Sequence, residues 1–287
     1  MLSSPYLLQR VSESNHLHAR SSEWFAENER ALMNSVMSSH GPTTGGTIVL
    51  GELGELSFPY FVMGDIDSAK LFGLDEIILF AYYYSNRSRF RRTLDLGANI
   101  GLHTLVMKKL GFDVVSYEPD MIHLKQFEKV MSLNGMTTKG LRPKAISDKK
   151  GLMEYIRILG NTTGSHLLGS KEGVYGPTDI VSVEVDDILE VLDQGNFDLV
   201  KMDVEGHEAI LLNCLTAKSL KNTDIMLEIG SEKNASDIYE ILKQKGIPAY
   251  AQKINWRLVE KLENLPSHHT HGSVFLSMQG APNWNYF

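Results

Sequence analysis

The sequence is almost without cysteine, because Cys214 is the only one among 287 residues. A single cysteine excludes a disulfide within the chain, and chains without such bridges are typical of a reducing cytoplasm. No apolar run approaches the ~18 residues of a membrane span, and no charged segment followed by an apolar one marks a signal peptide. We therefore expect a cytoplasmic protein with no membrane partner.

The sequence also has fewer basic residues than acidic ones. The 28 Lys and Arg residues stand against 35 Asp and Glu residues, which gives a formal charge of −7. Binding to nucleic acid needs a basic face, and the one dense basic run, residues 87–92, has the pattern of a solvated helix end. We expect no nucleic-acid partner. Hydrophobic residues make up 43% of the chain, which is ample for one large α/β domain.

The stretch TLDLGANIGLHT at residues 93–104 organises the rest of the chain. Its pattern predicts a short strand, a tight turn and the start of a helix. Such a turn places free backbone N–H groups in a concave cradle, and glycine lets a ligand approach the backbone closely. Asp95 adds a carboxylate, which repels a pyrophosphate and suits a cationic ligand. The predicted turn and helix start comprise Gly97, Ala98, Asn99, Gly101, His103 and Thr104.

The sequence lacks the G-x-G-x-x-G fingerprint of dinucleotide binding, since its pattern here is D-x-G-x-N-x-G. The next predicted strand, residues 113–117, is followed directly by Glu118 and then Pro119. An acid at this distance commonly binds ribose hydroxyls. The spacing therefore favours S-adenosylmethionine over a nicotinamide dinucleotide, and we expect Asp95 near the methionine amine and Glu118 at the ribose diol.

The motifs DLGANIGLHT, SYEPD and VKMDVEGHEAIL resemble those of the FkbM family of S-adenosylmethionine-dependent methyltransferases, over about Phe61 to Met278. The resemblance implies S-adenosylmethionine as cofactor and places the turn at Ala145 and Ile146 against its adenine. It also implies that the segment before the glycine turn helps to cover the cofactor. The complete set of expected cofactor-binding residues is Asp95, Gly97, Ala98, Asn99, Gly101, His103, Thr104, Glu118, Pro119, Ala145, Ile146 and Asp203.

The alternation of apolar strands and helices predicts an α/β fold of the class I methyltransferase (Rossmann-like) type, with a seven-stranded, mostly parallel sheet and helices on both faces. We expect residues 1–60 to form a helix and hairpin extension, acting as a lid or a homodimer contact, and residues 61–287 to form the cofactor-binding domain. The expected strands are 93–96, 113–117, 141–145, 199–202, 225–229 and an antiparallel 273–278. The expected helices are 22–38, 68–84, 103–110, 121–134, 208–213 and 235–245. A hairpin at 47–63 and a turn or linker at 41–46 precede the sheet.

The reaction we expect is methyl transfer to the hydroxyl of a small molecule, with an amine as the second choice. A hydroxyl must lose its proton, so a base is needed. The candidates are His166 in a glycine-rich loop that we expect to be mobile, His269 in a short polar loop, and the carboxylates Asp203 and Glu205 after the strand at 199–202. Asp203 also serves as a cofactor candidate, and we expect no metal ligands. A nicotinamide oxidoreductase and a non-catalytic ligand-binding protein remain as alternatives.

Overall fold

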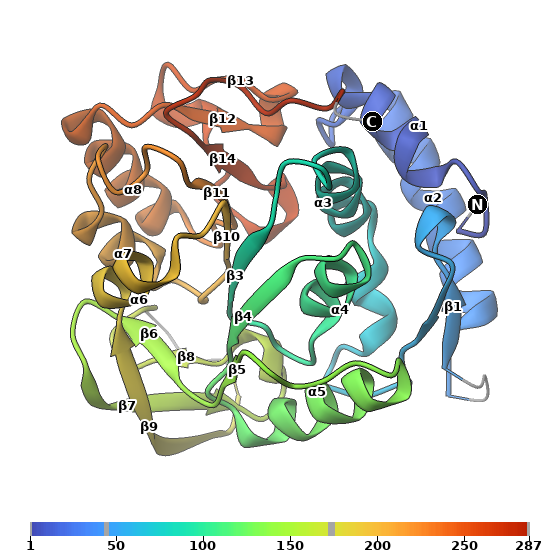
Figure 1. Cartoon of the computed structure of the whole chain (residues 1–287), viewed down its shortest axis with the longest axis horizontal. Helices are drawn as coiled ribbons and strands as arrows, with labels where there is room; N and C mark the ends of the chain where they lie inside the picture. The colour runs from blue at the N-terminus through green and yellow to red at the C-terminus, as the bar shows by residue number, and fades with distance from the viewer. Residues whose placement is uncertain (1, 43–45, 172–175, 286–287) are drawn as a thin grey trace.

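The predicted alternation of strands and helices forms a central sheet with helices on both faces (Figure 1). The computed structural model describes residues 2–42, 46–171 and 176–285. The predicted linker at 41–46 includes residues 43–45, which lie outside the described part. The central sheet has the order β13 (Arg257–Leu258), β12 (Ala249–Ala251), β14 (Val274–Leu276), β11 (Asp224–Leu227), β10 (Leu199–Met202), β3 (Arg92–Leu96), β4 (Asp113–Tyr117) and β5 (Leu141–Arg142).

The central sheet therefore has eight strands, and the predicted count of seven is wrong. Strands β11, β10, β3, β4 and β5 run parallel, whereas β14 is antiparallel to β11, as expected for the last strand. Beyond the six strands whose ranges were predicted, the sheet contains β12 and β13, which pair antiparallel at one edge. Asn255 and Trp256 permit their tight connection because both adopt positive φ angles, 56° and 59°.

The strand predicted at 141–145 splits between two sheets. Pro143 lacks a backbone N–H, so the ladder that begins at β5 cannot continue through it. The chain instead enters β6 (Ala145–Ser147), which belongs to a second sheet of order β6, β9 (Thr178–Asp187), β7 (Gly151–Ile158) and β8 (His166–Leu167). This second sheet lies beside the carboxyl ends of the central strands, at the bottom of Figure 1.

The helices divide into two layers. One face of the sheet packs against α3 (Leu74–Ser85), α4 (Leu102–Lys109) and α5 (Met121–Leu133). The other packs against α6 (Ile188–Gly195), α7 (Glu208–Cys214) and α8 (Glu232–Lys245). The helix predicted at 68–84 is interrupted by Gly73, which is the N-cap of α3 and separates it from a 3₁₀ turn at Ser68–Phe72. No helix in the described ranges is both long enough and apolar enough to cross a membrane.

The first 60 residues share a core with the cofactor-binding part of the chain. They contain α1 (Leu7–Glu13), which the sequence pattern missed, α2 (Glu23–Ser39), and the hairpin of β1 (Thr47–Val49) and β2 (Glu55–Ser57). Leu8, Leu32 and Ile48 are fully buried in one cluster with residues of α3 and α4. The apolar face of α2 is thus used within the chain. The proposed division at residue 60 and the homodimer contact stay predictions.

Candidate active site

The glycine turn after β3 is shaped by close backbone contacts. Gly97 has a φ of 76°, and a Cβ there would lie 1.8 Å from the carbonyl oxygen of Asp203. Gly101 has a φ of 90°, and a Cβ there would lie 2.6 Å from the Phe127 ring. Only glycine fits both constraints. The turn therefore brings the ends of β3 and β10 into direct contact.

The expected cradle of free N–H groups is wrong. The backbone N–H groups of Gly97 and Ala98 both donate to the carbonyl oxygen of Tyr117, at 3.1 and 3.0 Å. The N–H of Asn99 donates to Glu118 Oε2 at 2.8 Å. The turn satisfies its own donors because it folds back onto the end of β4. It has no free donors for a phosphate, and this agrees with the missing dinucleotide fingerprint.

Glu118 lies at the mouth of β4 and is 4% exposed. Its second oxygen, Oε1, accepts a hydrogen bond from the backbone N–H of Asp120 at 2.8 Å. The ring Nδ1 of His123 lies 3.5 Å from the same oxygen. The carboxylate is held from both sides, which fixes its orientation toward the cavity that it lines.

A buried charge network lies behind the turn. Lys201 is 7% exposed, and its Nζ donates to Asp203 Oδ2 at 3.1 Å and to the Gly97 carbonyl oxygen at 3.2 Å. Its distance to Asp95 Oδ1 is 3.9 Å. Burial acts to lower the pKa of Lys201, but Asp203 and Asp95 outweigh it, and the pKa is raised. Lys201 therefore stays charged and ties together the ends of β3 and β10.

A cavity of about 1400 Å³ runs along this edge of the sheet. It is bordered by the second sheet, the turn after β10, the loop before β14 and residues of the first 75. Of the expected cofactor-binding residues, those that line it are Gly97, Asn99, Glu118, Pro119, Ala145, Ile146 and Asp203. Those that do not are Asp95, Ala98, Gly101, His103 and Thr104.

The residues outside the lining support it from behind. Asp95 is fully buried and accepts a hydrogen bond from the Thr104 hydroxyl at 2.6 Å. His103 contacts Glu76, which does line the cavity, through its Nε2 at 2.7 Å. The expectation that Asp95 reaches a ligand directly is therefore not met in this geometry, because its side chain points under α4.

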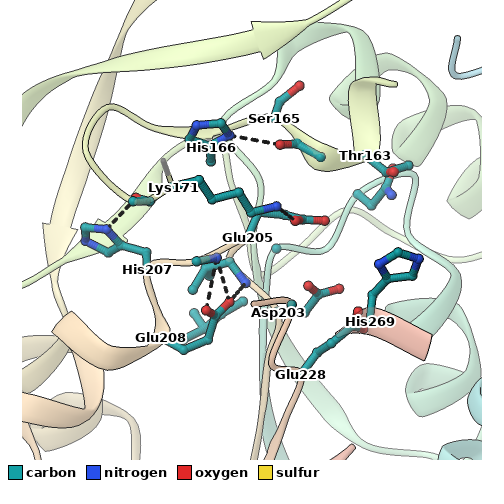
Figure 2. Close-up of a pocket in the computed structure, with 18 of the residues that line it drawn as sticks. Thr163, Ser165, His166, Lys171, Asp203, Glu205, His207, Glu208, Glu228 and His269 are labelled. Carbon is teal, nitrogen blue, oxygen red and sulfur yellow. Dashed lines mark hydrogen bonds and ion pairs between the residues drawn. The ribbon is translucent and has the colours of Figure 1, made fainter. Parts of the chain in front are cut away.

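The turn after β10 carries a set of carboxylates with separate roles. Glu208 accepts hydrogen bonds from the backbone N–H groups of Val204 and Gly206, and so closes the turn. Glu205 has a φ of 55° and forms an ion pair with Lys171. Burial raises the pKa of Glu205 to about 7, with Lys171 opposing the shift. Figure 2 shows this pair next to Asp203 on the cavity wall.

His166 differs from the mobile loop residue that we expected. It lies in β8, where it pairs with Ile156 of β7, and it is 1% exposed. Its Nδ1 donates to the Gly164 carbonyl oxygen at 2.9 Å (Figure 2). Its Nε2 has no hydrogen-bond partner among the described residues. Burial lowers the pKa of His166, so the ring is neutral and Nε2 carries a free lone pair.

The histidines before β14 lie only partly in the cavity. His268 and His269 line it, whereas His271 does not. A 3₁₀ turn begins at His269, and the ring centroids of His268 and His269 lie 3.9 Å apart. Burial and then the charge of His268 lower the pKa of His269. In the described ranges, no group of three or more His, Cys, Asp or Glu residues could hold a metal ion.

Three side chains of the site were not predicted from the sequence. Lys201 had a usable signal, because residues two apart on a strand face the same side and Asp203 follows it. Lys171 and His123 had none. Their places in the site depend on contacts with residues far away in the sequence.

A parallel sheet with a glycine turn, an acid after the next strand and a cavity along the strand ends defines a Rossmann-like α/β protein. Residues 95–247 match the model of the methyltransferase FkbM domain. The chain belongs to this family, and the resemblance inferred from the motifs is confirmed.

Solved structures of methyltransferases are similar to the chain at low identity. The bifunctional kinase-methyltransferase WbdD is 16% identical, with a TM-score of 0.39, over 71% of this chain and 39% of that one. Precorrin-6y C5,15-methyltransferase from Geobacter metallireducens is 12% identical (TM-score 0.35; 67% and 82% covered). A SAM-dependent methyltransferase from Agrobacterium tumefaciens is 12% identical (TM-score 0.36; 70% and 61% covered). The chain thus spans about two fifths of WbdD. No curated protein matches it.

Proposed function

We propose that this protein transfers a methyl group from S-adenosylmethionine to the hydroxyl of a small molecule. When bound, that cofactor supplies a methyl group already activated on a sulfonium. The residues present fit it: Gly97 and Asn99 line the cavity at the glycine turn, and the carboxylate of Glu118 stands fixed at the cavity wall. Asp203 adds negative charge nearby, which suits a cation, whereas burial and the charge of Asp203 raise the pKa of the neighbouring Glu228.

His166 is the observation that carries the choice of a hydroxyl acceptor. A hydroxyl needs a base, and a neutral histidine with one nitrogen anchored and the other unpaired is suited to take its proton. The hydrogen bond from Nδ1 to Gly164 fixes the tautomer. Methyl transfer then needs this base and correct alignment of the acceptor beside it.

An acceptor screen tests this function. The full chain is incubated with S-adenosylmethionine and a panel of hydroxyl and amine compounds, and release of S-adenosylhomocysteine is followed. We expect turnover with hydroxyl acceptors, reduced about 10²–10⁴-fold in His166→Gln with cofactor affinity retained. Turnover with amine compounds alone would show that the acceptor is an amine and not a hydroxyl. Loss of turnover in Glu205→Gln but not in His166→Gln would assign the base to the carboxylate.

The remaining expectations concern the setting of the reaction. We propose a cytoplasmic location, supported by the single cysteine, and a metal-free reaction. A homodimer through residues 1–60 is the partner that the sequence suggested, and the exposed side chains of Tyr6 (58%) and Met37 (60%) support it.

A further inference from the structure

His123 stands between the two halves of the cavity. It lies in the first turn of α5 and is 3% exposed. Its Nδ1 is 3.5 Å from Glu118 Oε1, on the side that we assign to the cofactor. Its Nε2 is 3.0 Å from the Thr162 hydroxyl, in the 3₁₀ turn Thr162–Gly164. One buried ring thus contacts Glu118, which lines the cavity, and Thr162, which lies behind the lining residues Thr163 and Gly164.

The turn at Thr162 in turn holds His166. The carbonyl oxygen of Gly164, at the end of this turn, accepts the hydrogen bond from His166 Nδ1. The backbone of the turn is fixed on its far side, because the N–H of Thr162 donates to the Met63 carbonyl oxygen at 3.0 Å. Gly64 packs so closely there that a Cβ would lie 2.1 Å from the Gly160 carbonyl oxygen. The turn Thr162–Gly164 is therefore the connection between the Thr162 hydroxyl and the His166 ring.

The charges around His123 favour its protonated form. Burial acts to lower the pKa of His123, but the hydrogen bond and charge of Glu118 outweigh it, with Asp120 adding and Arg157 opposing. The net shift is upward. Arg157 of β7 is itself paired with Asp120 at 2.6 Å. A protonated ring donates from both nitrogens, so it holds Glu118 and Thr162 at the same time.

We propose that His123 is a positioning residue that couples occupancy of the cofactor half of the cavity to the orientation of His166. The inference rests on the proposed function, because it takes Glu118 as the carboxylate that a ribose diol contacts. A ligand that donates a hydrogen bond to Glu118 weakens the attraction between this carboxylate and the His123 ring. The ring then shifts, and the Thr162 hydroxyl shifts with it because the two are hydrogen-bonded. His166 is thereby aligned when the cofactor is in place.

Histidine-ring NMR on the full chain tests the coupling, with S-adenosylhomocysteine as the probe. The His166 signal is assigned by its loss in His166→Gln. We expect the probe to shift this signal in the wild-type protein, and to lose more than half of the shift in His123→Gln and in Thr162→Val. Thr162→Ser keeps the hydroxyl and should keep the shift. The exposed His16→Gln is the matched control and should also keep it.

Calorimetry separates this inference from the proposed function. Thr162 lies outside the cavity lining, so Thr162→Val should bind the probe as the wild type does, while His123→Gln should bind it about tenfold more weakly, as expected for a lost hydrogen bond to a charged group. If the wild type does not bind the probe, the proposed function fails. If the probe binds but Thr162→Val keeps the full His166 shift, the coupling is refuted and the function stands.

Discussion

Glu118 combines a structural and a binding role in one side chain. Its two oxygens already accept backbone hydrogen bonds from Asn99 and Asp120, and Oε1 also faces His123 Nδ1 at 3.5 Å. Because the side chain lines the cavity, the remaining lone pair of Oε2 is the acceptor that a ribose hydroxyl would need. Glu118 therefore fixes the shape of the glycine turn and holds the turn at the cavity wall, where the ligand would bind.

Replacement of Glu118 should weaken cofactor binding. A hydrogen bond to a charged group is worth about 1.5–3 kcal/mol, so we expect Glu118→Ala to lose roughly 10- to 150-fold in affinity for S-adenosylmethionine. Calorimetric titration measures this, with circular dichroism to confirm folding. Glu154→Gln, at an exposed position of β7, is the control that should bind normally. Wild-type affinity in Glu118→Ala would show that Glu118 does not contact the cofactor.

At the scale of elements, the glycine turn between β3 and α4 has the least freedom to change. Gly97→Ala must accommodate both a positive φ and a contact of 1.8 Å with Asp203. Gly111 has a similar φ of 89° but nothing within 4 Å of a Cβ. An alanine at position 111 adds backbone strain alone, whereas an alanine at position 97 adds both backbone strain and a steric clash.

We expect Gly111→Ala to cost about 1–2 kcal/mol of unfolding free energy, as for a non-glycine residue in left-handed conformation. Gly97→Ala should cost more than 4 kcal/mol, the range of exceptional core damage, or move β10 away from the turn and abolish cofactor binding. Urea unfolding and calorimetry measure the two effects. Equal costs at both positions would mean that the contact between Gly97 and Asp203 is not maintained in solution.

The sequence predicted the elements whose signals are local. The strand and turn at 93–101, the strand at 113–117 and the acid at Glu118 were all found, because apolar alternation, glycine and spacing are read within a few residues. The second sheet was missed, since its strands pair across as many as 40 positions, as between Ala145 and Val185. The break at Pro143 carried a signal that could have been used.

Catalytic candidates were harder to predict than cofactor candidates for the same reason. His166 was chosen for its residue type and its glycine-rich surroundings, and those surroundings indicated a mobile loop. Its actual properties come from pairing with Ile156 and from the Gly164 carbonyl. The function of a histidine depends on what each of its ring nitrogens contacts, and such contacts cannot be read from the order of residues alone.

Across the whole molecule, His18 joins the first helices to the C-terminal part of the chain. It is fully buried, its Nε2 donates to the Val11 carbonyl at 2.8 Å, and its Nδ1 accepts from Trp256 Nε1 at 2.9 Å. The ring of Trp284 lies 4.9 Å away. A proton on Nδ1 would face the N–H of Trp256, so that two donors would meet. Burial of the ring lowers the pKa of His18 to about 4.

This lowered pKa predicts a loss of stability in acid. Between pH 6.5 and about 4 the unfolded chain binds a proton at His18 that the folded chain does not. Stability therefore falls as the pH is lowered through this window, by about 3 kcal/mol from this residue. Urea unfolding of wild type and His18→Gln should show a stability gap at pH 7 that narrows toward pH 4. A gap that does not change with pH would refute the assignment, and His16→Gln should show none.

The contacts of His18 and Ala19 also govern how the protein matures on the ribosome. Ala19 N–H donates to Asn255 and His18 accepts from Trp256, partners that are 236 and 238 positions further along the chain. At ~5–20 residues per second, translation of that interval takes about 12–48 s. During this time the segment near His18 waits without its final neighbours. Completion of the packing around it is a late step of biosynthesis, and nascent chains halted before residue 255 should leave this segment open to protease.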